Sequence, residues 1–395
     1  MSKDSLPSIN QSQILALARL AASSPALEIG EFSIENLAGG AGEGSRGIYR
    51  VAGKGIAQDQ PFPWSLILKV LVPPDDLSSQ AVHSPSGFAY WKREAEALTS
   101  GLLDDLTAGL SVPHCYGAIT QPDGSVWLWM EEVHEDSVNW TVSQYGKVAH
   151  QLGEWQGQYL TGKKLPEASW LTPRWWNRDF VEENCAAVDL LQRSLDRPWI
   201  RYAFPPKRLK AMLWIWQKRK IFYRILENLP QVFCHRDVFR RNLMARTRMG
   251  ADAKSTPDTV LIDWAYAGIG AIGEDLVPLI QATYLWSEVE RETFRELEEA
   301  ALAGYIEGLS QAGWQGNPQL VRLGYAAASA LRYNLGNLRF WFPYLVEENA
   351  LPDAIDEPVR ETREAIDFWN GTLEQYIYPL AHEAVKLARK VLSWP

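Results

Sequence analysis

The sequence predicts an α+β protein in which a small antiparallel sheet with one helix precedes a larger, mainly helical part. Residues 27–133 contain short runs of β-branched and aromatic residues separated by Gly and Pro, a pattern typical of a β-meander. From about residue 140 onward, apolar residues recur mainly at helical spacing. The chain has 395 residues, a length that suits two domains or one large bilobal unit, and 46% of them are hydrophobic and 22% charged, so it has ample apolar surface to bury.

The N-terminal part opens with an amphipathic segment, residues 9–23, in which Ile14 and Leu17 lie at helical spacing. The elements expected after this helix are strands over residues 27–37, 47–53 and 64–72, a helix over 87–103, and strands over 114–120 and 126–133. A Pro-Asp-Gly turn at residues 122–124 separates the last two strands.

The remaining chain is predicted to be helical except for one pair of strands. Its expected helices cover residues 141–160, 207–228, 288–312, 317–335 and 358–392. The two strands cover residues 231–238 and 258–265, and the polar segment 245–258 is predicted to be a flexible hairpin loop. A polar stretch over 132–139 marks the boundary between two parts. The expected domains are residues 1–133 and 134–395.

Charge and cysteine content exclude several classes of protein. With 39 Lys and Arg against 48 Asp and Glu, the net charge is −9, which argues against a partner held by its phosphate backbone, so no nucleic acid is expected. Three scattered cysteines suit neither a disulfide framework nor a zinc site and predict a reducing compartment. No apolar run is long enough to span a bilayer and no signal peptide is recognised, so we expect a cytoplasmic protein with no membrane partner.

The sharpest motif is His235-Arg236-Asp237 followed by Asn242, in the segment HRDVFRRN. Phosphoryl transfer from ATP needs a carboxylate that accepts the proton of the attacking hydroxyl and an amide oxygen that holds Mg²⁺. Asp237 and Asn242 suit these two roles. The alternative is that Asp237 caps a turn while His235 satisfies the backbone.

A second carboxylate follows an apolar strand, because Asp263 comes directly after residues 259–262. A carboxylate at the end of a buried strand is well placed to hold a metal ion that bridges phosphates. Taken alone, an Asp at this place is commonly a turn residue.

Two charged residues of the N-terminal part are expected to form an ion pair. Strand alternation puts Lys69 on the same face as Ile67 and Leu71, where an ammonium needs an anion. Glu94 is the one acid on the apolar stripe of the following helix. A Lys69–Glu94 pair would hold the lysine against nucleotide phosphates. The alternative is a solvated lysine and a solvated acid.

These residues together resemble the aminoglycoside phosphotransferase family, which includes choline-kinase-like enzymes and is distantly related to protein kinases. The family pattern of a His-x-Asp-x-x-x-x-Asn loop, an Ile-Asp-Trp strand end and a later Asp matches HRDVFRRN, LIDWAYAGIGAIGEDL and Asp275. The resemblance implies a bilobal protein-kinase-like fold with a catalytic base at Asp237 and metal ligands at Asn242 and Asp263. It also implies that Asp275 anchors the backbone of the catalytic loop, with His235 as structural support. Arg236 departs from the pattern, because the family usually has Gly at this position.

The resemblance also implies a nucleotide site in the N-terminal part that takes ATP with Mg²⁺. Glycines in the turn over residues 37–47 would let the backbone close over phosphates, although any hairpin can carry such a turn. The residues assigned to the turn are Gly40, Gly42, Gly44 and Ser45. The segment LWMEEV matches the family's hinge, where adenine would bind the Glu131 carbonyl and the Val133 amide. A plain edge strand would look similar.

The expected activity is transfer of the γ-phosphate of ATP to a hydroxyl group of a small molecule. No Ala-Pro-Glu follows Asp263, so the chain lacks the segment with which protein kinases dock peptides. A choline, ethanolamine, amino-alcohol or sugar kinase is the alternative of the same fold, and an inactive nucleotide-binding regulatory module is the alternative of another class.

Aromatic residues interleaved with acids predict that the acceptor is cationic, through charge and cation–π contacts. The residues concerned are Trp175, Trp176, Asp179, Glu182 and Glu183 in one stretch and Trp341, Tyr344, Glu347 and Glu348 in another. The alternative is packed aromatic side chains beside solvated acids.

Overall fold

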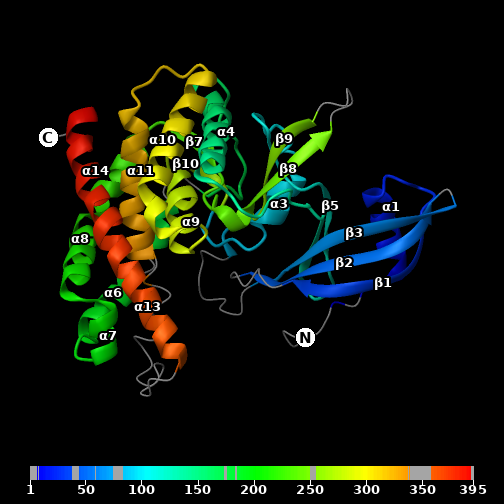
Figure 1. Ribbon diagram of the computed structural model, residues 1–395, viewed down its shortest axis with the longest axis horizontal. Coiled ribbons are helices and arrows are strands. Elements are labelled where there is room, and N and C mark those ends of the chain that lie inside the picture. Colours follow the sequence, from blue (N-terminus) through cyan, green and yellow to red (C-terminus); the bar gives the residue numbers. More distant parts are fainter. Residues whose placement is uncertain are drawn as a thin grey trace. The chain divides into compact units, whose positions relative to one another are not determined.

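The structure is a computed structural model of the chain. The structure describes residues 7, 9–37, 44–57, 59–73, 83–172, 176–182, 185–249, 255–336, 338 and 357–392 (Figure 1). Two compact units make up the chain. Unit 1 comprises Met1–Asn139, Pro166–Leu171 and Arg241–Ala267, and unit 2 comprises Trp140–Leu165, Thr172–Arg240 and Gly268–Pro395. Each unit therefore joins segments that are distant in sequence. The division into functional domains at residue 133 stays a prediction.

Unit 1 contains a five-stranded antiparallel sheet in the order β1-β2-β3-β6-β5. The strands are β1 (Glu28–Leu37), β2 (Ser45–Ala57), β3 (Gln60–Leu71), β5 (Cys115–Thr120) and β6 (Val126–Met130). Alternation along the strands buries Val51, Leu66 and Leu68 in a core that also contains Trp129. Helix α1 (Gln11–Ala21) adds Ile14 to this core. The strands thus lie where the alternating sequence pattern predicts them.

The helix expected over residues 87–103 is much shorter in the structure, where α3 covers Arg93–Thr99. The buried Arg93 guanidinium explains its late start. It donates hydrogen bonds to the carbonyl oxygens of Phe88 (2.8 Å), Trp170 (2.7 Å) and Ala265 (2.7 Å). The preceding backbone forms turns that present carbonyls to Arg93 instead of continuing the helix, and Gly101 follows with a φ of +76°.

A three-stranded sheet in the order β4-β9-β8 completes unit 1. Its strands are β4 (Leu110–Ser111), β8 (Leu243–Met249) and β9 (Ser255–Leu261). The prediction of a loop over 245–258 is wrong for most of that segment, because β8 and β9 pair along it. Polar side chains on the two paired strands contact each other across the sheet. Arg246 Nη2 on β8, for example, lies 3.1 Å from Asp258 Oδ2 on β9. The turn that joins the two strands, residues 250–254, lies outside the described residues.

Unit 2 is mainly helical. Its α-helices are α4 (Val142–Leu160), α5 (Trp176–Glu182), α6 (Cys185–Arg193), α7 (Pro198–Ala203), α8 (Pro206–Asn228), α9 (Thr283–Leu285), α10 (Phe294–Gln311), α11 (Gln319–Leu331), α13 (Glu357–Thr372) and α14 (Tyr378–Val391). Short 3₁₀ turns lie at η1 (Arg240–Asn242), which crosses into unit 1, and at η3 (Arg291–Thr293). Turns of π-helix lie at η2 (Pro278–Ala282), η4 (Arg332–Gly336) and η5 (Leu373–Ile377).

Local chemistry explains several of these boundaries. Thr141 and Gln144 form a capping box that starts α4. Helix α4 packs closely on α10, because a Cβ at Gly153 would overlap the Tyr305 carbonyl and one at Gly308 would overlap the His150 carbonyl. The helix predicted over 358–392 is instead α13 and α14 joined by the π turn η5. Pro379 at the start of α14 cannot donate a backbone hydrogen bond to the preceding turn.

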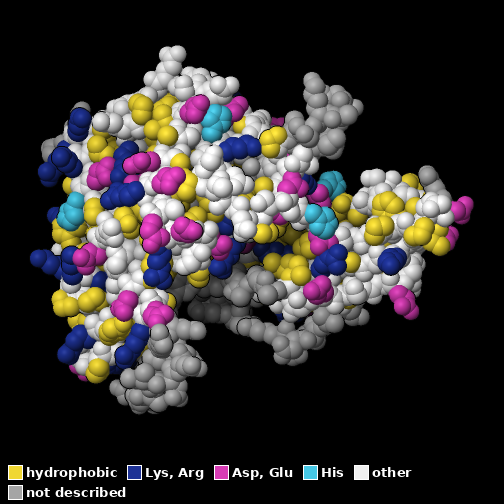
Figure 2. Space-filling view, viewed as in Figure 1, with side chains coloured by type: hydrophobic (Ala, Val, Ile, Leu, Met, Phe, Trp, Pro, Cys, Tyr) yellow, Lys and Arg dark blue, Asp and Glu magenta, His cyan; other side chains and the backbone are white. Residues whose placement is uncertain are grey.

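Strands β7 (Gln231–Cys234) and β10 (Gly268–Ala271) form a two-stranded antiparallel sheet within unit 2, with Cys234 opposite Gly268. This pair of strands positions the segment that follows Cys234. The face of the helices seen in Figure 2 mixes Lys and Arg with Asp and Glu. Among the described residues, none of the helices combines the length and apolarity needed to cross a membrane.

Candidate active site

The backbone that follows β7 is held by one buried carboxylate. Asp275 Oδ2 accepts a hydrogen bond from His235 N at 3.0 Å, and Asp275 Oδ1 accepts one from Arg236 N at 2.6 Å. Gln156 Nε2 donates to Oδ2 at 2.7 Å from α4. Burial raises the pKa of Asp275 to about 6, while the backbone hydrogen bonds from Arg236 and His235 act in the opposite direction. Asp275 therefore fixes the start of the loop that carries Asp237.

Arg236 occupies the position where the resembled family usually has Gly, and its φ is +68°. A left-handed conformation costs a residue with a Cβ about 1–2 kcal/mol. The buried side chain offsets this cost, because its Nε lies 2.9 Å from Glu274 Oε1 and its other nitrogens bond Thr172 Oγ1 and the Ile269 carbonyl. Arg236 thus holds a left-handed conformation that glycine adopts more readily.

Asp237 follows directly and is paired with a residue that sequence reasoning missed. Arg332 Nη2 lies 2.8 Å from Asp237 Oδ1, and Arg332 Nη1 donates to the Arg236 carbonyl. Asp237 N donates to His235 Nδ1 at 3.2 Å. One signal could have pointed to Arg332: it is the single charged residue between Arg322 and Arg339.

In unit 1, Lys69 on β3 lies between two carboxylates. Its Nζ is 2.5 Å from Glu94 Oε2 on α3 and 3.1 Å from Asp263 Oδ1, and only 7% of its side chain is exposed. Burial acts to lower the pKa of Lys69, but Asp263 and Glu94 raise it above its ordinary value. Burial raises the pKa of Glu94, and the lysine opposes that shift. The pairing with Asp263 could not be read from the sequence.

Asp263 and Asn242 are the residues of unit 1 that could hold a metal ion. Asp263 follows β9 with a φ of +61°, and 37% of its side chain is exposed. Asn242 is buried, and its carbonyl accepts a hydrogen bond from Ile262 N at 3.1 Å. In the described part of the chain, no three His, Cys, Asp or Glu side chains cluster as a metal cage. A carboxylate and an amide oxygen fit Mg²⁺, which keeps several water ligands.

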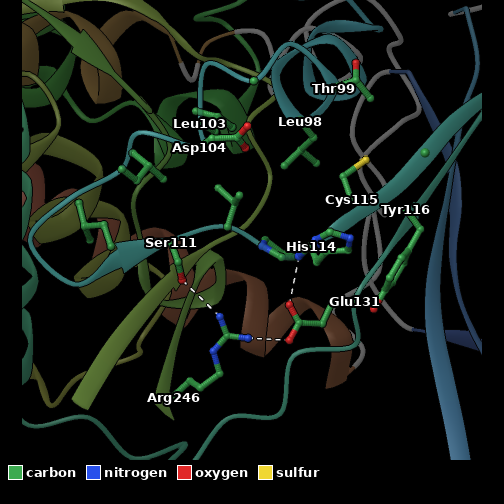
Figure 3. A pocket seen from close by; sticks show the side chains of 16 residues that line it. Leu98, Thr99, Leu103, Asp104, Ser111, His114, Cys115, Tyr116, Glu131 and Arg246 are labelled. Atoms are coloured by element: carbon green, nitrogen blue, oxygen red, sulfur yellow. Dashed lines mark hydrogen bonds and ion pairs between the residues drawn. The ribbon is translucent and has the colours of Figure 1, made fainter. Parts of the chain in front are cut away.

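Glu131, the first residue after β6, is held by contacts with His114 and Arg246 (Figure 3). Glu131 N donates to the His114 carbonyl at 2.9 Å, and Glu131 Oε2 accepts from His114 N at 3.0 Å. Glu131 Oε1 lies 2.6 Å from Arg246 Nη1. These three residues line a cavity of about 950 Å³ within unit 1. Val133, two residues further on, is half-buried.

The glycine-rich turn is described only at its end. Gly44 has a φ of +93°, its carbonyl accepts from Val72 N at 2.9 Å, and a Cβ there would lie 2.7 Å from the Trp91 Cβ. Ser45 begins β2, and its buried Oγ has no hydrogen-bond partner among the described residues. Gly40 and Gly42 lie outside those residues.

Of the residues expected to bind a cationic acceptor, one side chain can be described in its contacts. Glu182 in α5 is bound by Arg219 Nε at 2.9 Å and by the Tyr223 hydroxyl at 3.3 Å. Trp176 and Asp179 also lie in α5. Trp175, Glu183, Trp341, Tyr344, Glu347 and Glu348 lie outside the described residues. The Glu182 carboxylate is therefore already neutralised within unit 2.

An antiparallel sheet with a lysine–carboxylate pair and a helical unit with an anchored His-Arg-Asp loop define the class of protein-kinase-like phosphotransferases. The family described as "Phosphotransferase enzyme family" (APH) matches residues 88–331, and the chain belongs to this family. The family suggested by the motifs is thereby confirmed. The match begins at residue 88, so Lys69 lies before it.

The solved structure of a choline kinase confirms the predicted fold class. Choline kinase from Cryptosporidium parvum Iowa II is similar at 12% identity and a TM-score of 0.53, over 96% of this chain and 99% of that one. Amicoumacin kinase hAmiN, in complex with AMP-PNP, Ca²⁺ and Ami, has 13% identity and a TM-score of 0.48 over 94% and 95% of the two chains. Spectinomycin phosphotransferase APH(9)-Ia, in complex with ADP and spectinomycin, has 12% identity and a TM-score of 0.47 over 96% and 100%. A comparison with curated proteins finds no significant match.

Family membership and fold identify an enzyme, an ATP-dependent phosphotransferase that acts on small molecules.

The Lys69–Glu94 contact leads to a prediction about nucleotide binding. Lys69→Ala should weaken ATP binding at least about tenfold, because a charge-assisted hydrogen bond contributes about 1.5–3 kcal/mol. Glu94→Gln should weaken it less, because Glu94 acts through the lysine. The double variant should bind no more weakly than Lys69→Ala, as calorimetric titration with ATP and Mg²⁺ would measure.

Lys54→Ala is the matched control, because Lys54 is an exposed lysine of the neighbouring strand β2. It should bind ATP like the wild type. Additive losses in the Lys69 and Glu94 variants would contradict a shared role in binding phosphate.

Proposed function

We propose that this phosphotransferase uses Asp237 as the general base that activates a hydroxyl of its small-molecule acceptor. The observation that carries the proposal is the loop around Asp237, whose backbone is bound by Asp275 on one side while its carboxylate is held by Arg332. A catalytic carboxylate must be fixed in position, because it acts only within hydrogen-bond reach of the hydroxyl.

The reaction moves one proton and one phosphoryl group. The acceptor O–H donates its proton to the Asp237 carboxylate while its oxygen forms a bond to the γ-phosphorus of ATP. The bond from the γ-phosphorus to the β–γ bridging oxygen breaks, and its electron pair leaves with ADP. The products are ADP, a phosphate monoester and a proton that Asp237 later releases.

Asn242 and Asp263 are the residues we assign to Mg²⁺, because their oxygen donors fit it and Asp263 is partly exposed. When bound, the ion neutralises negative charge on the phosphates. Covalent geometry supports joint action with Asp237. Asn242 is the fifth residue after Asp237, so their Cα atoms lie at most about 18 Å apart.

The remaining nucleotide contacts are assigned to unit 1. Lys69, kept cationic by its two carboxylates, suits the α- and β-phosphates. Gly40, Gly42, Gly44 and Ser45 are assigned to the phosphates. The buried Ser45 Oγ, which has no hydrogen-bond partner among the described residues, supports this. The Glu131 carbonyl and the Val133 amide are assigned to adenine. The bonds from Glu131 to His114 and Arg246 support the first of these, because they restrain the backbone that carries the carbonyl.

We further propose that the acceptor is cationic. The net charge of −9 supports this, because a negative field favours the approach of cations and slows that of anions. Glu182 does not contribute to this proposal, because its carboxylate is already paired with Arg219. Neutral sugars and amino alcohols are the competing acceptors.

Asp237→Asn should lower kcat by roughly 10²-fold or more with little change in nucleotide affinity, because a general base contributes about 10²–10⁴-fold and acts in the transition state. Coupled-enzyme detection of ADP would measure the rate. Asp189→Asn, at an exposed Asp of α6, is the control and should match the wild type. Equal rates in the two variants would remove Asp237 from the mechanism.

Asp263→Asn should raise the Mg²⁺ concentration needed for half-maximal rate by about tenfold or more, because an amide replaces the one charged ligand assigned to the ion. A Mg²⁺ titration of the rate, and of ADP affinity by calorimetry, would measure this. Asp104→Asn, at an exposed Asp of unit 1, should leave both curves unchanged. An unchanged Mg²⁺ requirement in Asp263→Asn would place the metal elsewhere.

Choline and its neutral carbon analogue 3,3-dimethyl-1-butanol form a matched pair for the acceptor. Within an ADP-release screen of amino alcohols, aminoglycosides and sugars, charged acceptors should show a kcat/KM at least about tenfold above that of neutral ones of the same size. The advantage should shrink as salt is added, because salt screens the protein's field. Preference for an anionic hydroxyl compound would refute the cationic assignment and leave the phosphotransferase activity standing.

A further inference from the structure

Arg332 is a cation that directly follows a buried, uncharged stretch of α11. Every residue of α11 from Leu323 to Leu331 is buried, and Arg332 begins the π turn η4 that continues this helix. Only 12% of its side chain is exposed. A guanidinium held away from water is costly unless its donors are bound by acceptors, so its contacts indicate why it is there.

Two of its contacts lie on consecutive residues of the loop. Nη2 binds the Asp237 carboxylate through Oδ1 at 2.8 Å, and Nη1 donates to the carbonyl of Arg236. The Asp237 side chain is 19% exposed, so solvent screens this pair less than a surface ion pair. One planar guanidinium therefore restrains both the backbone before the carboxylate and the carboxylate itself.

The helix that carries Arg332 is fixed to the same part of the chain as Asp275. Gln281, in the π turn η2 six residues after Asp275, donates to Ser329 Oγ at 2.6 Å and to Tyr325 OH at 3.1 Å on α11. Asn334 Nδ2 donates to the Ala330 carbonyl at 3.0 Å, where the helix changes from α to π geometry. Such π turns occur often at functional sites. Arg332 thus reaches Asp237 from a rigid, doubly anchored element.

We propose that Arg332 is a positioning residue for phosphoryl transfer, which orients the Asp237 carboxylate by binding Oδ1. This rests on the proposed role of Asp237 as the base.

The test uses the full chain, Mg·ATP and water as the phosphoryl acceptor, so no acceptor need be known. Arg332→Ala should lower kcat for ATP hydrolysis by about 10²-fold, the cost of misplacing a catalytic group by about 1 Å, with KM for ATP unchanged within roughly twofold. Ethylguanidinium at millimolar concentration should restore part of this rate. Adding Asp237→Asn should cause no further loss, because Arg332 acts through that carboxylate.

Arg322→Ala is the matched control, because Arg322 lies on the same helix and its Nε is 2.7 Å from Glu383 Oε1, within an ion pair. It should lower the melting temperature but leave kcat unchanged and gain nothing from ethylguanidinium. Arg332→Lys tests the same point if the alanine variant does not fold. One ammonium cannot hold both loop contacts, so kcat should fall about tenfold at an unchanged melting temperature.

The outcomes separate the inference from the proposed function. Wild-type kcat in Arg332→Ala or Arg332→Lys, or a loss in the alanine variant that ethylguanidinium does not restore, would overturn the role of Arg332. If Asp237→Asn hydrolysed ATP at the wild-type rate, the proposed base would be wrong and the inference would fall with it. The same holds if the wild type hydrolysed no ATP.

Discussion

The buried Asp275 carboxylate is the interaction on which the catalytic loop depends. Removing a carboxylate from water costs several kcal/mol, and three hydrogen bonds, from His235 N, Arg236 N and Gln156 Nε2, offset that cost. Two of the three donors are backbone amides, so satisfying this charge also fixes the path of the chain. Arg236 can then adopt its left-handed conformation, and Asp237 follows from a backbone that has little freedom.

Unit 1 shows the same principle with the opposite charge. The buried Lys69 ammonium requires anions, and the two that it binds differ in exposure: Glu94 is buried, whereas Asp263 is 37% exposed. The buried acid is suited to hold the lysine in place. The exposed acid is suited to a metal ion as well, because solvent and ligands can reach it. Burial thus distinguishes two carboxylates that contact the same ammonium.

Short-range patterns were sufficient for much of the fold and for most of the candidate residues. Strand alternation placed β2 and β3, and therefore the side of the sheet on which Lys69 lies. The helix predicted over 87–103 is longer than the observed one, because apolar periodicity does not show that Arg93 binds the carbonyl of Phe88. The strands β8 and β9 were underestimated for a related reason. The polar residues of this segment predict a loop, because the sequence does not show that Arg246 and Asp258 pair across two strands.

The sequence by itself determined the family, the fold class and the chemical type of each proposed catalytic group, because those depend on residue identity and spacing within short segments. The Lys69–Glu94 pair was predictable from strand and helix facing, whereas other partners were decided by the tertiary structure alone. Arg332 meets Asp237 across 95 residues, and Arg246 meets Glu131 across 115. The physical reason is that an ion pair in a folded protein depends on which helices and strands pack together. Local periodicity records which face of an element is buried, and it does not record what that face is buried against.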